Sequence, residues 1–216
     1  MYKTILLSLF LLLSGLVFGQ KNVGYSQEVN NIQERIKKTW NHKESAIVFT
    51  GSSSIRLWKD LQERFPQTQI LNTGFGGSES YDLLGYIDEL VINYNPKKVF
   101  VYEGDNDIAN GKKWREILNN LERITDKIHK KLPNTEVYLI SAKPSIDRWK
   151  LRRKYRRLNK EIKNYAQRVA HVTFVDVWQV MLNGRKLNKS LFIEDGLHMT
   201  KDGYDIWEKE LKPHVN

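Results

Sequence analysis

The sequence contains no cysteine, and this absence excludes several classes of protein. Disulfide scaffolds, zinc fingers, iron–sulfur proteins and enzymes with a thiol nucleophile all depend on cysteine side chains. Proline is scarce too, with five residues in 216, and the content of 28% charged and 11% aromatic residues is neither disordered nor collagen-like. A chain of this length is sufficient for one well-cored domain, and we expect one.

Long apolar runs are also missing, except for one at the N-terminus. Residues Ile5 to Leu13 are almost wholly apolar, follow the positive charge of Lys3 and precede Gly19, a small residue at a plausible cleavage site. The apolar stretch is about 14 residues long, short of the ~20 that a membrane-spanning helix needs. We therefore predict that residues 1–19 are a cleaved signal peptide, that the protein is exported to the periplasm or beyond, and that no stable membrane anchor remains.

Positive charge is in excess, with 35 Lys and Arg against 25 Asp and Glu, and one segment holds much of it. The segment Arg148–Arg168 contains ten Lys and Arg and one Glu. Apolar residues recur there at spacings of four and three, which predicts a helix with one buried stripe: Leu151, Tyr155, Leu158, Ile162, Tyr165 and Val169. The basic faces are either a surface for a polyanion or the solvated side of a packed helix. No nucleic-acid motif accompanies them, so we expect no nucleic-acid partner.

Short strand-like segments alternate with longer helical segments along the rest of the chain. Five β-branched or aromatic runs predict strands: Ala46–Thr50, Gln69–Asn72, Lys98–Glu103, Glu136–Ile140 and Val172–Val175. The segments around them predict helices: Gln27–Lys38, Ser54–Arg64, Ser78–Asn93, Lys112–Lys131, Arg148–Val169 and Thr200–Lys212. This alternation predicts a three-layer α/β fold, in which helices cover both faces of a parallel sheet. We expect residues 20–45 to form an extension with a leading helix, and residues 46–216 to form the main domain.

Functional residues in a parallel sheet gather in the loops that leave the carboxyl ends of its strands. The loop after the first strand is Gly51-Ser52-Ser53-Ser54, which leads directly into a helix. A serine on such a turn is held outward at the positive end of a helix dipole, where a nucleophile would be placed. Serine is also a preferred helix cap, so the segment alone is compatible with either role.

Three further loops carry glycine-rich or polar residues. The loop from Asn72 to Ser78 has three glycines in four positions, which permits either N–H groups aimed at an anion or a plain turn. Asn106, after the third strand, could donate its amide to a developing oxyanion or simply form a turn. Asp195 stands three residues before His198, a spacing at which a carboxylate can accept the ring N–H of a histidine. No HExxH pattern or closely paired histidines indicate a metal, so we expect none.

The order of these loops, serine, glycine, asparagine and then Asp-x-x-His, resembles the SGNH hydrolase superfamily. These proteins are also called GDSL-like esterases and lipases, and they include a platelet-activating-factor-acetylhydrolase-like branch. The resemblance runs from about Ala46 to Trp207, through the blocks IVFTGSSSIRLW, LNTGFGGSES, YEGDND and DGLHMTKDGYDIW. It implies a flavodoxin-like fold with five parallel strands in the order 2-1-3-4-5, and a serine esterase that needs no cofactor.

The resemblance also implies a role for each residue of the site. Ser53 would be the nucleophile, His198 the base and Asp195 the carboxylate that orients the histidine. The oxyanion donors would be the N–H groups of Ser53 and Gly77 and the side-chain amide of Asn106.

One departure from the family pattern lies in the first loop. The usual Gly-Asp-Ser is replaced by Gly51-Ser52-Ser53, so a serine stands where the family has an aspartate. Adjacent serine side chains on a turn from strand to helix point in different directions, and only one can face His198. We expect this to be Ser53, because it stands two residues after Gly51 and a nucleophile must reach its base.

The natural ester is not specified by these motifs. Export and the lack of a long apolar lid insertion favour short-acyl esters of carbohydrate, such as acetyl esters, with lipid esters of the lysophospholipase kind as the alternative. Four aromatic residues in or beside the loops are expected to line a sugar platform or an acyl pocket: Phe75, Tyr81, Trp149 and Phe192. A rival hypothesis is a non-catalytic protein that binds a polyanion through Arg148–Arg168.

Overall fold

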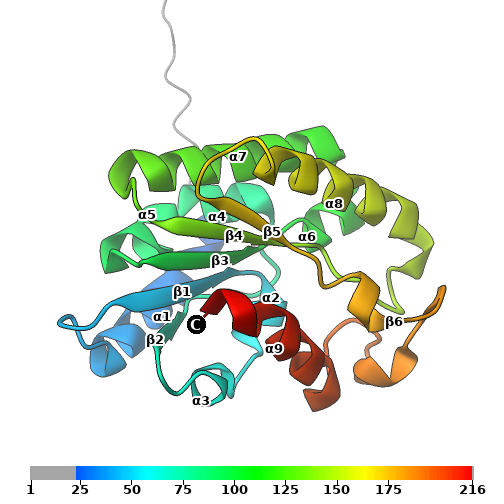
Figure 1. Ribbon diagram of the computed structural model, residues 1–216, viewed down its shortest axis with the longest axis horizontal. Coiled ribbons are helices and arrows are strands. Elements are labelled where there is room, and N and C mark those ends of the chain that lie inside the picture. The colour runs from blue at the N-terminus through cyan, green and yellow to red at the C-terminus, as the bar shows by residue number, and fades with distance from the viewer. Residues whose placement is uncertain (1–22, 216) are drawn as a thin grey trace, which may run out of the picture.

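A computed structural model describes residues 23–215, and its centre is a five-stranded parallel sheet (Figure 1). The strands lie in the order β2-β1-β3-β4-β5, and every neighbouring pair is parallel. Their bounds are β1 Ala46–Gly51, β2 Gln69–Asn72, β3 Lys98–Tyr102, β4 Glu136–Ile140 and β5 Val172–Val175. The predicted strands and the order implied by the family resemblance are confirmed.

Alternate residues of each strand face two separate cores, because successive side chains of a strand point to opposite faces. Val48 and Val99 belong to the core on one face of the sheet. Phe49 and Phe100 stack on each other in the core on the other face, with ring centroids 4.4 Å apart. Both faces are apolar, so both must be covered by helices.

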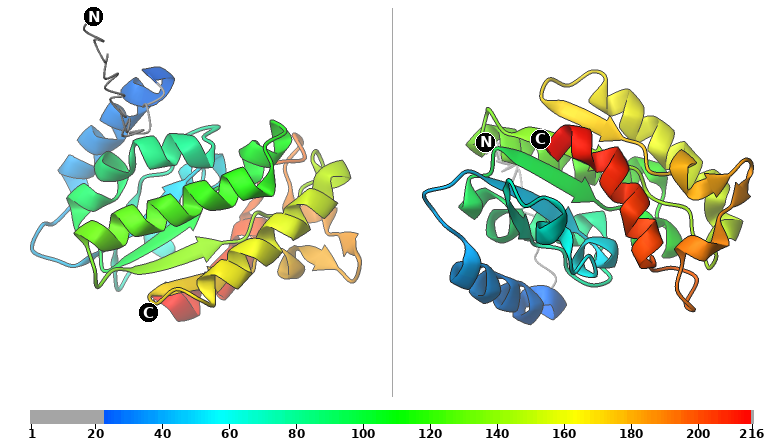
Figure 2. Two further views of the ribbon diagram at one scale, coloured as in Figure 1. Left: turned by 90° about the horizontal axis from the view of Figure 1, so that it is seen from above. Right: turned by 60° about the horizontal axis from the view of Figure 1, so that its bottom comes forward.

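Helices form the two outer layers, as expected (Figures 1 and 2). The first core is covered by α1 Ser26–Thr39, α4 Ser80–Gly85, α5 Ile87–Leu90, α7 Trp114–Lys131 and α8 Arg152–Ala166. The second core is covered by α2 Ser53–Arg56, α3 Leu61–Arg64 and α9 Lys201–Val215. Helix α8 buries Tyr155, Leu158, Ile162 and Tyr165 of the predicted apolar stripe, while most of its basic side chains are exposed.

Two segments that we expected to be single helices are interrupted. The segment Ser54–Arg64 forms α2 and α3, and Trp58, which is buried in the second core, lies in the turn between them. The segment Ser78–Asn93 divides into α4 and α5 at Tyr86, whose buried ring contacts that of Phe75.

Several short elements near the carboxyl ends of the strands were not predicted. Helix α6 (Asp105–Ala109) directly follows β3, and a two-stranded hairpin, β6 (Leu182–Asn183) and β7 (Lys186–Leu187), lies between β5 and α9. A 3₁₀ turn over Trp149–Leu151 precedes α8, which therefore begins four residues later than expected. A further 3₁₀ turn, Lys189–Leu191, follows the hairpin.

Two predictions concern the N-terminal part of the chain, and the structure describes only one of the two segments. The predicted signal peptide, residues 1–19, lies outside the described residues. The leading helix is present as α1, which packs Val29, Ile32 and Ile36 into the first core. Within residues 23–215, no helix combines the length and apolarity that crossing a membrane requires.

At Gly51, the last residue of β1, the backbone passes very close to β3. Gly51 has φ +120°, and a Cβ atom there would lie 2.0 Å from the carbonyl oxygen of Tyr102 on β3. Gly111 also has a positive φ, +86°, but a Cβ atom there would meet nothing within 4 Å. We expect Gly111→Ala to cost about 1 kcal/mol of strain and Gly51→Ala at least about 2 kcal/mol more, measured by urea unfolding. Equal losses in the two variants would show that the close approach of β1 and β3 does not matter.

Candidate active site

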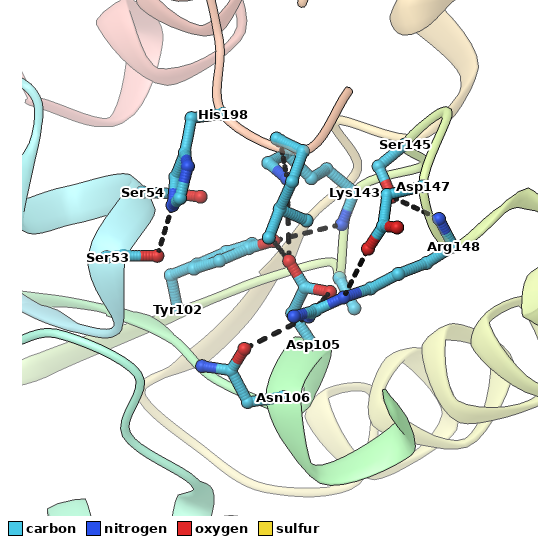
Figure 3. Close-up of polar contacts among 12 residues, drawn as sticks. Ser53, Ser54, Tyr102, Asp105, Asn106, Lys143, Ser145, Asp147, Arg148 and His198 are labelled. Atoms are coloured by element: carbon cyan, nitrogen blue, oxygen red, sulfur yellow. Dashed lines mark hydrogen bonds and ion pairs between the residues drawn. The ribbon is translucent and has the colours of Figure 1, made fainter. Parts of the chain in front are cut away.

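Four segments meet at the carboxyl edge of the sheet, and three of their side chains form a hydrogen-bonded chain. The Ser53 hydroxyl lies 2.9 Å from Nε2 of His198 (Figure 3). On the other side of the ring, Nδ1 of His198 lies 2.5 Å from Oδ2 of Asp195. The backbone N–H groups of Leu197 and His198 donate to the other Asp195 oxygen at 2.8 and 2.9 Å. The structure thus brings the three predicted residues together across 145 positions of sequence.

The structure also separates the three adjacent serines. Ser53 is the first residue of α2, half-buried, with its hydroxyl directed at His198. Ser52 and Ser54 on either side are each only 2% exposed. Ser52 stands at the cap position of α2, yet its side chain makes no capping hydrogen bond. Geometry therefore favours Ser53 over its neighbours as the residue that a substrate could reach.

The protonation of Asp195 follows from its surroundings. Partial burial raises its pKa, but the hydrogen bonds from the His198 ring and from two backbone N–H groups outweigh this and lower the pKa to about 2. The carboxylate is therefore ionised at neutral pH and accepts the Nδ1–H of the histidine. This tautomer leaves Nε2 free to accept the proton of the Ser53 hydroxyl.

Besides Ser53, the other two predicted oxyanion donors, Gly77 and Asn106, lie in different settings. Gly77 is exposed and has φ +73°, a backbone conformation that favours glycine. Asn106 is largely buried at the start of α6, where its Nδ2 donates to the carbonyl of Ser78 at 2.8 Å. One amide hydrogen is used in this bond and the other remains available. Figure 3 shows the amide nitrogen turned to the side on which Ser53 lies.

Sequence reasoning missed a buried charge cluster centred on Asp105, which is 4% exposed. Its carboxylate accepts from Arg148 at 2.6 Å, from the Tyr102 hydroxyl at 3.0 Å and from Lys143 at 3.4 Å (Figure 3). It also accepts from the Tyr155 hydroxyl at 2.7 Å. Burial alone would raise the pKa of Asp105, but the two cations and the hydrogen bonds lower it to about 2. The carboxylate is therefore ionised, with both neighbouring cations as partners.

The charge cluster around Asp105 contacts both Asn106 and the loop that carries His198. Arg148 uses the same Nη1 atom to donate to Oδ1 of Asn106 at 3.0 Å, which fixes the orientation of that amide. Lys143 donates to the carbonyl of Leu197 at 2.8 Å, beside His198. The only signal in the sequence was a charged residue at each of these positions, since all contacts of the cluster except that of Tyr102 with Asp105 join residues 38 to 54 positions apart.

Two further buried acids, Glu103 and Asp107, lie beneath the glycine-rich loop, residues 72–78. Glu103 is almost fully buried and accepts from the Ser78 hydroxyl at 2.7 Å. Burial, together with the nearby charge of Asp107, raises the pKa of Glu103 well above its usual range. Asp107 accepts from the backbone N–H and the hydroxyl of Ser80 and from the N–H of Gly104, and burial raises its pKa to about 6. These bonds attach the loop after β2 to the end of β3.

The four aromatic residues predicted to line a substrate pocket differ in exposure. Tyr81 is 40% exposed on α4, and Trp149 is half-buried in the turn before α8. Phe75 is completely buried against Tyr25, so the prediction that it lines a pocket is wrong: its ring fills the core beneath the glycine-rich loop. Phe192 is 7% exposed and packs in the second core, so it too offers almost no surface.

Metal ligation is not supported by the described part of the chain. Among residues 23–215 there is no group of three or more His, Asp or Glu side chains that could hold a metal ion.

Comparison with known proteins places this geometry in a family. The family model for the GDSL-like Lipase/Acylhydrolase family matches residues 45–206, and the chain belongs to this family of hydrolases. Among solved structures, a protein assigned as a platelet activating factor from Streptococcus pneumonia has 28% identity and a TM-score of 0.77 over 88% of this chain and 94% of its own. An acylhydrolase from Bacteroides fragilis has 25% identity and a TM-score of 0.74, covering 90% and 96%.

Two other matches are more distant or partial. An acetyl-xylooligosaccharide esterase from Geobacillus, solved as a mutant, shares the fold at 17% identity and a TM-score of 0.67, over 80% of this chain and 94% of its own. The N-acylneuraminate cytidylyltransferase of Escherichia coli is 27% identical over 186 residues, which is 84% of this chain and 43% of that protein. The chain therefore spans less than half the length of this relative.

The raised pKa of Glu103 predicts a specific pH dependence of stability. Because folding disfavours ionisation of this buried acid, wild type should lose stability as pH rises above 4.5, the ordinary pKa of the group. Glu103→Gln keeps the shape and the acceptor for Ser78 but cannot ionise. The free energy of unfolding of the variant relative to wild type should therefore increase by up to about 1.4 kcal/mol per pH unit above this value. A difference that stays constant from pH 4 to 8 in urea titrations would contradict the raised pKa.

Proposed function

We propose that the protein is a serine esterase that hydrolyses carboxylic esters through an acyl-enzyme. The observation that carries the proposal is the hydrogen-bonded chain from Ser53 through His198 to Asp195. A serine hydroxyl is a weak nucleophile on its own, and a histidine within hydrogen-bond distance can remove its proton during attack. The ionised Asp195 stabilises the imidazolium that results, and it keeps the ring in the tautomer that accepts from serine.

The reaction follows in two halves. His198 takes the proton of Ser53, and Oγ attacks the ester carbonyl carbon to give a tetrahedral oxyanion. The N–H groups of Ser53 and Gly77 and the free amide hydrogen of Asn106 are the proposed donors to that oxygen. His198 then protonates the departing alcohol, after which it activates a water that attacks the acyl-serine and releases the acid. All protons move between these groups, water and the substrate, so the mechanism calls for no cofactor.

We propose a short-acyl ester of a carbohydrate, such as an acetyl ester, as the substrate. The relative from Escherichia coli is named for N-acylneuraminate, a sugar, and the same fold carries an acetyl-xylooligosaccharide esterase. The exposed rings of Tyr81 and Trp149 support a sugar platform. A lipid ester is the second candidate, favoured by the likeness to the protein from Streptococcus pneumonia. A polyanion contact along the basic face of α8, in the segment Arg148–Arg168, is supported only by charge.

We also propose that the protein is exported. The support is the sequence pattern of residues 1–19, with its positive charge, apolar run and small residue. N-terminal sequencing of the protein recovered outside the cytoplasm should begin at Gln20, and an N-terminus at Met1 in the cytoplasm would refute export.

The nucleophile is tested with p-nitrophenyl esters from acetate to longer acyl chains, using protein that begins at Gln20. Ser53→Ala should lower kcat by at least about 10⁴-fold, because it removes the hydroxyl that is hydrogen-bonded to His198. Ser52→Ala and Ser54→Ala are matched controls, in which a neighbouring hydroxyl is removed and most activity should survive. Turnover retained in Ser53→Ala would move the nucleophile to a neighbour. A sharp fall beyond short chains would favour deacetylation over lipid cleavage.

The oxyanion role of Asn106 is tested by Asn106→Ala, which removes the amide donor without adding a charge to the site. Loss of one such donor should lower kcat by on the order of 10²–10³-fold with little change in KM. Asn110→Ala, at the other end of α6, removes an exposed amide and should leave kcat unchanged. If Asn106→Ala retained full kcat, the donor would have to be sought elsewhere.

A further inference from the structure

A groove of about 570 Å³ opens beside the candidate active site, and we call it the basic groove. Its apolar surface is provided by Ile146, Trp149 and Leu187. Its remaining lining residues are all cationic: Arg152, Arg185, Lys186 and Lys189. One wall is the segment that leads into α8, and the other is the hairpin of β6 and β7 with the 3₁₀ turn that follows it. Figure 1 shows the hairpin on the side of the molecule where α8 begins.

Both walls of the basic groove adjoin the loop that carries Asp195 and His198. On one side, the backbone N–H groups of Ile146 and the next residue donate to the carbonyl of Gly196 at 2.8 and 3.0 Å. On the other side, Ile193 follows the hairpin and its 3₁₀ turn in the chain. Its backbone N–H donates to the carbonyl of His198 at 3.0 Å. A substrate with its ester at Ser53 can therefore extend over this loop into the groove.

The four cations of the basic groove lack acidic partners. Within residues 23–215 none of them forms an ion pair with an Asp or Glu side chain, whereas basic residues elsewhere do, such as Arg64 with three acids and Lys127 with Asp88. Four uncompensated positive charges around one concavity create a field that attracts an anion. A neutral substrate would make no use of this field.

The aromatic surface of the groove is preorganised. Arg152 lies over the Trp149 ring, 5.4 Å from its centroid, and donates to the Trp149 carbonyl at 3.1 Å. The Trp149 ring also stacks on that of Trp178, at 6.3 Å and an interplanar angle of 12°. An indole held in this way offers an apolar plane beside a guanidinium that can bind a carboxylate. A sugar ring that carries a carboxylate matches both features.

We propose that the basic groove is a subsite for a carboxylated sugar residue of the ester substrate. This proposal rests on the proposed esterase function and specifies its substrate: an acyl ester of an acidic carbohydrate. The ester carbonyl lies at Ser53, and the carboxylate of the same sugar lies among the four cations. The groove adds no chemical step, but orients the substrate through charge.

The test compares two substrates that differ only in the carboxylate, the 3-O-acetyl methyl glycosides of glucuronic acid and of glucose. Wild type should prefer the acidic ester by about 10-fold in kcat/KM at low salt, and added salt should reduce that preference. Arg185→Gln combined with Lys189→Gln should bring the ratio close to one, mainly by raising KM for the acidic ester. Lys130→Gln combined with Lys131→Gln removes the same charge from exposed positions at the end of α7, and should leave the ratio unchanged.

Failure of the subsite and failure of the esterase give different results. Equal turnover of the two glycosides by a wild type that still hydrolyses p-nitrophenyl acetate would overturn the subsite alone. If no ester is hydrolysed, the esterase proposal fails, and calorimetry with trigalacturonate then tests the groove. Binding that is lost in the Arg185/Lys189 variant but kept in the Lys130/Lys131 variant would support the subsite. Binding that is absent, unchanged in both variants, or replaced by binding to anionic phospholipid vesicles would overturn it.

Discussion

Asp105 carries a charge that three separate segments of the chain must compensate together. Its carboxylate is buried between Lys143 and Arg148, and the hydroxyls of Tyr102 and Tyr155 occupy the remaining positions around it. Removing a carboxylate from water costs several kcal/mol unless opposite charges and donors surround it. The ends of β3 and β4 and the start of α8 are therefore held at one point, and the carboxyl edge of the sheet is built around this point.

The same contacts connect this buried centre to the reactive groups. Arg148 holds the amide of Asn106, while Lys143 holds the backbone beside His198. Ser53 is positioned independently, by the close approach of β1 to β3 at Gly51. The rigid support is thus buried, whereas the groups that would meet a substrate are partly exposed. Such a division suits a site in which donors must be in place before charge develops on the substrate.

Charge is distributed unevenly around this edge of the sheet. Acids dominate inside, where Asp105 is kept ionised by its cations while Glu103, two residues earlier, has a pKa raised by burial. Outside, the basic groove beside the loop of Asp195 and His198 is lined by four cations that form no ion pair with any acid among residues 23–215. The pKa values of two carboxyl groups only two positions apart are therefore shifted in opposite directions, because neighbours in space and not in sequence decide the cost of ionisation.

The sequence by itself determined the strands, the amphipathic stripe of α8 and the order of the four loops, because these depend on local composition and periodicity. It did not predict the breaks that divide two of the expected helices, or the burial of Phe75, whose ring packs against Tyr25 and Tyr86. The spacing to Gly51 predicted Ser53, but only the tertiary structure brings its hydroxyl to His198 and decides which cations surround Asp105. Those contacts join residues about 40 to 145 positions apart, and local sequence patterns carry no information on which distant side chains will meet.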